Sequence, residues 1–164
     1  MIISDKDIIR SRHQVWQNPW HFLAFGFGSG LARFAPGTFG TLAAIPPYLI
    51  LIQFSWAVYG LITIAAFFAG IRICQITSDD LKVHDFSGIV WDEFVGLWIT
   101  LFLIPFDWKW LLAGFILFRF FDIVKPWPIR YLDQHVEGGF GIMIDDVLAG
   151  IYAWACLFLI VKFY

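Results

Sequence analysis

Charged residues are scarce in this chain. Asp, Glu, Lys and Arg make up 15% of its 164 residues, whereas a soluble domain contains about 25%. Hydrophobic residues make up 60% and aromatic residues 20%, a composition that favours an integral membrane protein over a soluble one. The formal net charge is -2, and no basic stripe accompanies the aromatic residues. We therefore expect no nucleic-acid partner.

Cysteine is scarce as well. Cys74 and Cys156 lie in separate apolar segments without CxxC spacing. This pattern excludes a disulfide framework and a cysteine-based zinc site, so we expect two free thiols among apolar residues. Residues 1–7 lack the apolar run of a secretory signal, and we expect no cleaved leader.

Several familiar enzyme signatures are missing. Gly26-Phe-Gly28-Ser-Gly30 is not followed by Gly-Lys-Ser/Thr, so it is not a P-loop, and no strand–helix unit surrounds it as a dinucleotide site requires. The chain has neither the Cys-x5-Arg of cysteine phosphatases nor the Pro-Ser-Gly-His of lipid phosphatases with a histidine nucleophile. It also lacks the Asp-x2-Asp-Gly-x2-Ala-Arg of CDP-alcohol phosphotransferases, which argues against a nucleotide-linked donor.

A long apolar run predicts a first helical hairpin. One helical span of a bilayer needs about 20 residues. Residues 42–73 are nearly all apolar but are interrupted at Gln53-Phe-Ser55. We expect two helices, the first kinked or started at Pro46-Pro47 and the second running from about Trp56 into Thr77.

The rest of the chain completes a helical bundle. The apolar residues 94–121 break at Pro105-Phe-Asp107-Trp-Lys109 into halves too short to span alone, which predicts a shallow or tilted second hairpin. The last apolar segment, residues 147–163, can nearly span. Residues 1–21 mix basic and Trp residues with apolar ones, which predicts an interfacial helix. The fold expected is a single all-α domain over residues 1–164, an integral membrane helical bundle with helical hairpins and an N-terminal interfacial helix.

The hairpins predict where the polar connections lie. Each hairpin returns the chain to the side that it left, so Thr38, Asp92, Asp122 and Asp145 are expected on one face of the membrane. Basic residues in the N-terminal segment and in the later connections favour the cytoplasm for that face. We therefore expect a multi-pass protein with a cytoplasmic polar face.

Carboxylates stand at the ends of the apolar segments. Asp122 ends one segment and Asp145-Asp146 begin another, while Asp92-Glu93 lie between Trp91 and Phe94. Their burial is unfavourable unless a cation or hydrogen bonds compensate it. Oxygen ligands of this kind suit Mg²⁺, above all when phosphate is the partner. The predicted metal ligands are Asp92, Glu93, Asp122, Asp145 and Asp146, and the predicted catalytic residues are Asp92, Asp122, Asp145 and Asp146.

Two glycines predict how these acids come together. Gly96 follows Asp92 by one helical turn, and Gly150 follows Asp146 by one turn. A glycine below a carboxylate lets a second helix approach closely. We therefore expect acids from two helices to converge.

Basic residues near the acids predict a phosphate site. Arg119 and Lys125 lie three residues on either side of Asp122, and Arg119 shares a face with Asp122 if the helix continues. Pro36-Gly37-Thr38 has the form of a turn into a helix N-terminus, where free N–H groups attract anions; a simple turn and cap has the same form. The predicted phosphate-binding residues are Thr38, Arg119, Lys125 and Arg130.

Acids, Mg²⁺ and bases together suit hydrolysis of a phosphate monoester. The charge on the phosphoryl group and on the leaving alkoxide must be stabilised, and a nucleophile must be placed in line. Both a metal-bound water and an aspartate fit the role of nucleophile. His84 and His135 are candidate proton donors, with a structural role as the alternative for each. A small transporter or channel subunit with an acid-lined path is the alternative function, but acids at segment ends favour an interfacial enzyme.

Six segments occur together along the chain. They are Asn18-Pro-Trp-His21, Gly26-Phe-Gly-Ser-Gly30, Pro36-Gly-Thr38, Ile89-Val-Trp-Asp-Glu93, Lys125-Pro-Trp-Pro-Ile-Arg130 and Gly138-Gly-Phe-Gly-Ile-Met-Ile-Asp-Asp146. In this order they resemble the phosphatidylglycerophosphatase A family over nearly the whole chain. The resemblance implies an all-helical, Mg²⁺-dependent enzyme of the bacterial inner membrane that converts phosphatidylglycerophosphate to phosphatidylglycerol and phosphate. Its implied partner is the phospholipid substrate in the membrane, and the sequence indicates no obligate protein partner.

Overall fold

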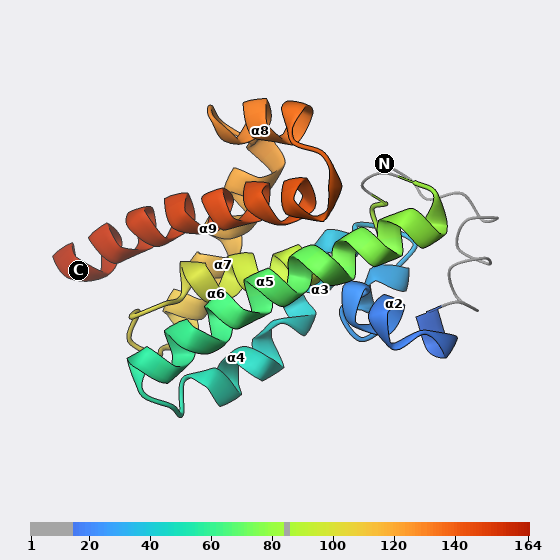
Figure 1. The fold of residues 1–164 in the computed structure, drawn as a ribbon. Coiled ribbons are helices and arrows are strands. Elements are labelled where there is room, and N and C mark those ends of the chain that lie inside the picture. The colour runs from blue at the N-terminus through green and yellow to red at the C-terminus, as the bar shows by residue number, and fades with distance from the viewer. Residues whose placement is uncertain (1–14, 84–85) are drawn as a thin grey trace.

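The regular elements of this protein are helices. The computed structural model describes residues 15–83 and 86–164, and within these ranges it has no strand, which confirms the predicted all-α class. Figure 1 shows the long helices α5 and α9 with the shorter helices packed around them. The elements are α2 (Pro19–Ala24), the 3-10 helix η1 (Ser29–Leu31), α3 (Pro36–Ala43), α4 (Ile45–Leu51), α5 (Trp56–Leu81), α6 (Trp91–Thr100), α7 (Trp108–Val124), α8 (Ile129–His135) and α9 (Gly138–Phe163).

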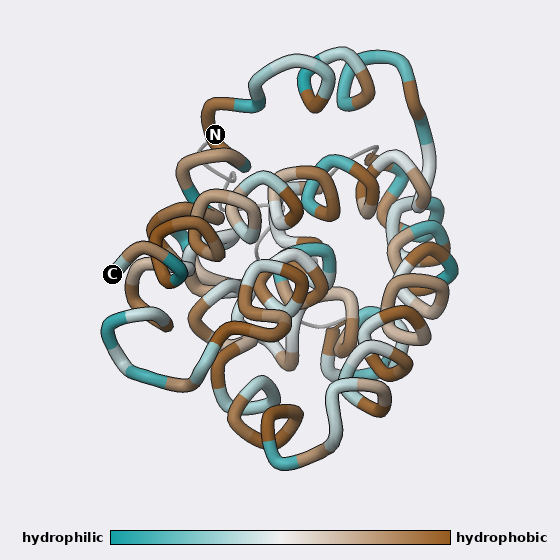
Figure 2. Tube along the Cα trace, turned by 90° about the vertical axis from the view of Figure 1, so that its left-hand side faces the viewer, coloured by the Kyte–Doolittle hydropathy of each residue, from teal (hydrophilic) through white to brown (hydrophobic). Residues whose placement is uncertain are grey.

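Helices α5 and α9 are long and apolar enough to cross a membrane. Each has 26 residues and a mean hydropathy of 1.9 over its most apolar part. Only 28% of that part in α5 and 33% in α9 is buried inside the protein, so neither is the enclosed core helix of a soluble domain. Figure 2 shows hydrophobic residues along much of the helices and hydrophilic ones mainly at turns and helix ends. The protein is a membrane protein.

The first predicted hairpin is found with its boundaries nearly in place. Pro46-Pro47 lie in the first turn of α4, and α5 begins at Trp56. α5 runs one turn past its predicted end at Thr77. At this end Nε2 of the buried His21 lies 2.9 Å from the carboxylate of Asp80, so α2 docks there and stabilises the last turn.

The second predicted hairpin is the pair α6 and α7. Asp107 caps α7, because its carboxylate accepts the N–H of Lys109 at 2.9 Å. α7 ends before Lys125, since that residue precedes Pro126 and a proline disfavours helical backbone in the residue before it. With 10 and 17 residues, α6 and α7 are both shorter than the about 20 residues of a full span, as predicted.

The predicted N-terminal helix does not run unbroken to residue 21. Residues 1–14 of that prediction lie outside the described part of the chain, but its end lies within it. The helix breaks at Asn18, whose side chain accepts the N–H of Trp20 at 3.0 Å and so caps a new helix, α2. Pro19 at the first position of α2 fits such a start.

The start of α9 also differs from the prediction. α9 begins at Gly138, whereas the apolar pattern placed the start at residue 147. The N–H of Gly139 donates to Oε1 of Gln75 at 2.7 Å, and a Cβ on Gly139 would lie 2.0 Å from the carbonyl oxygen of Ile71. These contacts with α5 hold a glycine-rich stretch of low helix propensity in the helix. Asp145 therefore lies about two turns inside α9 and not at its start.

Helices α6 and α9 cross at a pair of glycines. A Cβ on Gly150 would lie 2.6 Å from the carbonyl oxygen of Gly96, so the two backbones are in direct contact. Oγ1 of Thr100 lies 2.9 Å from that oxygen and 3.3 Å from the carbonyl oxygen of Gly150. The predicted close approach of two acid-bearing helices is confirmed. The fully buried side chains of the surrounding core include Phe94, Leu97, Phe118 and Leu157.

Gly150→Ala should destabilise the protein, because its Cβ has no room at the crossing. Overpacking of this kind costs about 1–3 kcal/mol, and the Tm of the detergent-solubilised protein should fall. Gly60→Ala is the matched control, since a Cβ there would meet the ring of Phe102 at an ordinary 3.5 Å. That control should gain up to about 1 kcal/mol from helix propensity. Equal Tm values for the two variants would contradict the described crossing.

Candidate functional site

A glycine-lined socket fixes the start of α6. The side chain of Val90, just before α6, packs against Gly30 and Gly40, where a Cβ would come within 3.2 and 2.6 Å of it. The N–H of Val90 donates to the carbonyl oxygen of Ala24 at 2.8 Å. The glycine-rich segment therefore has a packing role, and it holds Glu93 of α6 against α3.

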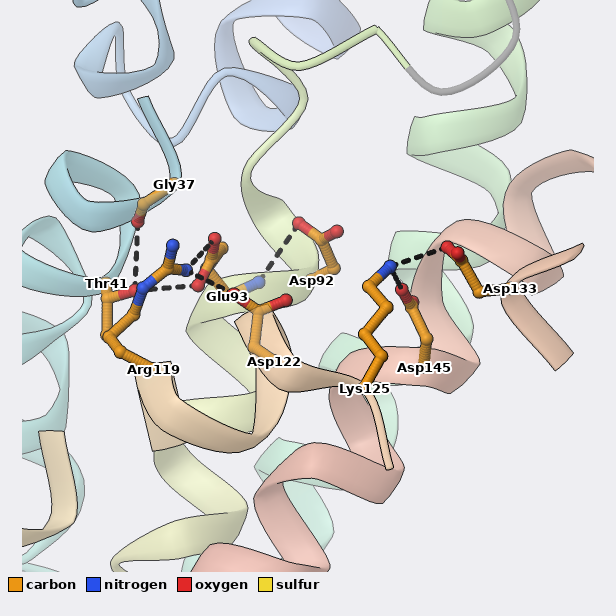
Figure 3. A network of polar contacts seen from close by, with 9 residues as sticks. All are labelled: Gly37, Thr41, Asp92, Glu93, Arg119, Asp122, Lys125, Asp133 and Asp145. Atoms are coloured by element: carbon orange, nitrogen blue, oxygen red, sulfur yellow. Dashed lines mark hydrogen bonds and ion pairs between the residues drawn. The ribbon is translucent and has the colours of Figure 1, made fainter. Parts of the chain in front are cut away.

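Glu93 joins α3, α6 and α7 (Figure 3). Oγ1 of Thr41 in α3 lies 2.7 Å from Oε2 of Glu93 and 2.9 Å from the carbonyl oxygen of Gly37. Nη1 of Arg119 in α7 donates to Oε1 of Glu93. A Cβ on Gly37 would lie 2.1 Å from the same Oε1, so the glycine lets the start of α3 close over the ion pair. Residues of α3 and α7 therefore meet on one carboxylate of α6.

Burial changes the protonation of Glu93. Loss of solvent raises the pKa of this carboxyl to about 7, and the charge of Asp122 acts in the same direction, while Arg119 and Thr41 oppose it. The Thr41 hydroxyl has one hydrogen for two acceptors, so both of its contacts are full hydrogen bonds when Glu93 carries a proton. Burial therefore favours the protonated form of this carboxyl more than water does.

Arg119 also pairs with Asp122. Its Nη1 lies 2.8 Å from Oδ2 of Asp122, one turn further along α7, which confirms the predicted contact. Nε of Arg119 is buried and has no acceptor among the described residues. An unsatisfied buried donor is unfavourable, and this one is available to an acceptor that a ligand brings.

Lys125 bridges two further acids. Its Nζ lies 2.6 Å from Oδ2 of Asp145 in α9 and 2.5 Å from Oδ1 of Asp133 in α8. Lys125 caps α7 with a φ of 45°, and its side chain points toward both carboxylates (Figure 3). Burial by itself lowers the pKa of the ammonium group, but Asp145 and Asp133 outweigh this effect and hold the pKa above its usual value. Lys125 is therefore a permanent cation that links α7, α8 and α9.

Two carboxylate oxygens of α9 lack partners. Oδ1 of Asp145 and Oδ2 of Asp146 are buried and accept no hydrogen bond from the described residues. Asp122, Glu93 and Asp92 lie close enough for their charges to act on Asp146. Negative charge gathered in so small a space is unfavourable unless protons or a cation compensate it. The arrangement fits a bound cation.

The acids do not form a ready-made metal site. In the described part of the chain, no three His, Cys, Asp or Glu side chains are grouped as ligands of one ion. Arg119 holds acids of α6 and α7 in one group, and Lys125 holds acids of α8 and α9 in another, with Asp92 between the two groups in Figure 3. Asp92 accepts the N–H of Glu93 at 3.0 Å. Binding of one ion by all five acids stays a prediction.

The other predicted residues lie around these groups. Thr38 is in the first turn of α3. Arg130 is exposed on α8 and forms no ion pair with the described residues. His135 is exposed too, and its ring stacks on Tyr131 with 4.2 Å between centroids, which gives it a structural contact within α8. His84 lies outside the described residues.

Two residues of the network escaped the sequence analysis. Thr41 follows Gly37 by one helical turn and therefore shares the face of α3 that meets Glu93, a spacing that the sequence does show. Asp133 lies eight residues after Lys125, beyond a turn with two prolines. Only the fold shows that these two side chains meet.

Comparisons with known proteins point to one family. The family profile described as Phosphatidylglycerophosphatase A matches residues 22–161. A protein of that name from Escherichia coli (strain K12) is 49% identical over 156 residues, which cover 94% of this chain and 90% of the relative. Its namesake from Haemophilus influenzae is 54% identical over 145 residues, covering 87% and 89%. A relative from Bacteroides thetaiotaomicron, named as a candidate phosphatidylinositol-3-phosphatase, is 40% identical over 141 residues, covering 79% and 85%.

The matched range includes both ion-pair groups of the site. No solved structure matches the chain at a significant level. The profile nevertheless extends from α2 into the last turns of α9, and two relatives that share its name are similar over most of both chains. The chain therefore belongs to the phosphatidylglycerophosphatase A family.

Proposed function

We propose that this protein hydrolyses phosphatidylglycerophosphate to phosphatidylglycerol and inorganic phosphate. Relatives that are 49% and 54% identical carry the name of this activity. The observation that carries the proposal is the combination of an unused buried donor on Arg119 with unpartnered buried oxygens on Asp145 and Asp146. The donor on Arg119 suits a phosphate oxygen, and the carboxylate oxygens of Asp145 and Asp146 suit a divalent cation.

Arg119 and Lys125 are the proposed ligands of the phosphate. Carboxylates from several helices hold both side chains, so their positions are set before substrate binds. Guanidinium and ammonium groups form strong charge-assisted hydrogen bonds with phosphate oxygens. Thr38, in the first turn of α3, and Arg130, on α8, complete the proposed set.

The acids are the proposed ligands of Mg²⁺. Oxygen donors suit this ion, which when bound supplies positive charge to the phosphoryl group and to the leaving alkoxide. Asp145 and Asp146 offer the buried oxygens without partners. The remaining proposed ligands come from α6 and α7 and are Asp92, Glu93 and Asp122. The proposed catalytic residues are Asp92, Asp122, Asp145 and Asp146.

We place the site at the cytoplasmic face of a bacterial inner membrane, which the chain crosses more than once. The named relatives come from bacteria, and the distribution of basic residues favours the cytoplasm for the polar face. The start of α6 and the end of α7 meet at the site. A phospholipid with its phosphate at headgroup depth would reach the acids without leaving the bilayer.

Asp145→Asn and Asp146→Asn should each abolish phosphate release from phosphatidylglycerophosphate in mixed micelles. Asn keeps the shape of the side chain but removes its charge. The Tm of Asp146→Asn without metal should therefore change little, whereas that of Asp145→Asn should fall, because this variant loses the ion pair with Lys125. Mg²⁺ should raise the Tm of the wild type and not that of Asp146→Asn. Asp79→Asn, at an exposed acid near the end of α5, is the control.

These measurements test separately whether each aspartate belongs to the site and whether the protein binds Mg²⁺. Full activity in either α9 variant would remove that residue from the site. A Tm that does not respond to Mg²⁺ in the wild type would contradict metal binding, whatever the activity.

Lys125→Ala should lower kcat by about 10²–10³, the loss typical of a preorganised contact to charge that develops in the transition state. Lys162→Ala, which removes an exposed cation from the last turn of α9, should leave kcat unchanged. Phosphate release under saturating lipid measures both variants. An unaltered kcat for Lys125→Ala would limit that residue to anchoring α8 and α9.

The protein should strongly prefer phosphatidylglycerophosphate over water-soluble glycerol 3-phosphate in kcat/KM. Binding energy from acyl chains, which do not react, can position the phosphate. The comparison should be made in mixed micelles at fixed surface concentration. Phosphatidylinositol 3-phosphate belongs in the same series, because one relative is named for that headgroup. Equal kcat/KM for the lipid and for glycerol 3-phosphate would contradict a contribution of the acyl chains to the reaction.

A further inference from the structure

An apolar groove of about 800 Å³ runs between α5, α6 and α9. Two of its lining side chains carry polar atoms, Thr63 and Trp154. The Thr63 hydroxyl donates to the carbonyl oxygen of Tyr59 at 3.0 Å, and Nε1 of Trp154 donates to that of Phe102 at 2.8 Å. These polar atoms are already bonded, so the groove suits an apolar occupant. Its lining includes Gly60, Phe67, Ile99, Phe102, Val147 and Ile151.

The groove exists because α6 and the turn after it separate the two long helices. Near the start of α9, Gly139 lies directly against the carbonyl of Ile71 in α5. Farther along, Phe102 stands between them: its carbonyl accepts the bond from Trp154, and its ring lies 3.5 Å from a Cβ built on Gly60. In Figure 1, α6 lies between α5 and α9. α6 therefore forms the floor of the groove.

The groove begins at the proposed active site. In α9, the first lining residue, Val147, is one residue beyond Asp146 and therefore begins the groove at the same level of the helix, on a different face. In α6, the lining residues Val95 and Ile99 follow Asp92 by three and seven residues and share its helix face. A molecule held at Asp92 therefore has an apolar path that starts within one helical turn of this acid.

We propose that this groove binds one acyl chain of the lipid whose phosphate lies at the acids, an inference that rests on the proposed function. Along α5 the lining runs from Gly60 to Phe68, which is about 12 Å at about 1.5 Å per residue. One leaflet of a bilayer has about 15 Å of hydrocarbon. The groove is therefore long enough to contact an acyl chain over most of the depth of one leaflet. Ile64 and Ile151 at its edges are 57% and 41% exposed, which leaves a sideways entrance from the bilayer.

The groove acts by positioning the lipid. An acyl chain in a bilayer is already surrounded by hydrocarbon, so transfer into the groove brings little hydrophobic gain. Contact with α5, α6 and α9 instead restricts the directions in which the acyl chain extends from the glycerol. The phosphate at the other end is then held in fewer orientations relative to the acids, which raises the rate of reaction.

Ile64→Trp, which fills the groove, tests this inference. Ile116→Trp is the matched control, because Ile116 is 56% exposed on α7 and does not line the groove. We expect Ile64→Trp to lower kcat/KM for long-chain phosphatidylglycerophosphate about tenfold, a modest misplacement effect. It should leave kcat/KM unchanged for a short-chain form that does not reach into the groove. Ile116→Trp should match the wild type on both substrates.

Cross-linking locates the chain without relying on activity. Phosphatidylglycerophosphate with a diazirine on one acyl chain, added to the wild type in micelles, should label groove residues more strongly than phosphatidylcholine with the same chain. Ile64→Trp should lose this preference, and Ile116→Trp should keep it.

The outcomes separate the two proposals. A wild type that releases no phosphate from either chain length would overturn the proposed function. If the wild type is active, equal effects of the two Trp variants, or equal groove labelling by both lipids, would overturn only the proposal that the groove binds an acyl chain. If Ile64→Trp does not fold, the labelling of groove residues in the wild type by the two lipids tests the proposal.

Discussion

The structure depends on one constraint, which is that the negative charge of its buried carboxylates must be compensated. Two cations lie beside these carboxylates. A buried charge without a partner costs several kcal/mol, so each acid must be matched by a cation, a proton or hydrogen bonds. Glu93 meets this need through Arg119 and Thr41, and Asp145 through Lys125. Each of these bonds joins different helices. Pairing the charges therefore draws the ends of α3, α6, α7 and α8 toward the acid-bearing part of α9.

The helices that could be predicted are those with local signals. Asp107 and Lys125-Pro126 mark the ends of α7 in the sequence, because a cap and a proline act on neighbouring residues. The early start of α9 had no local signal. It depends on the bond between Gln75 and Gly139, which are 64 residues apart, and such a contact overrides the low helix propensity of glycine.

The site shows the same division between local and distant contacts. The pair Arg119–Asp122 follows from spacing on one helix, and the glycine crossing follows from the position of each glycine below an acid. Which acid each cation binds does not follow, because Lys125 caps α7 and Asp145 lies in α9, 20 residues away. The sequence therefore predicts the members of the site better than the bonds between them.

The early start of α9 has a consequence for depth. Its 26 residues measure about 39 Å, about 9 Å more than the roughly 30 Å thickness of a bilayer's hydrocarbon core. Asp145 is the eighth residue of the helix, so about 10 Å of helix precede it, which accounts for the whole excess. For an upright α9 whose C-terminal end lies at the far boundary, the hydrocarbon therefore ends at the acids. The turns ahead of them then stand among the headgroups, level with the phosphates of neighbouring lipids.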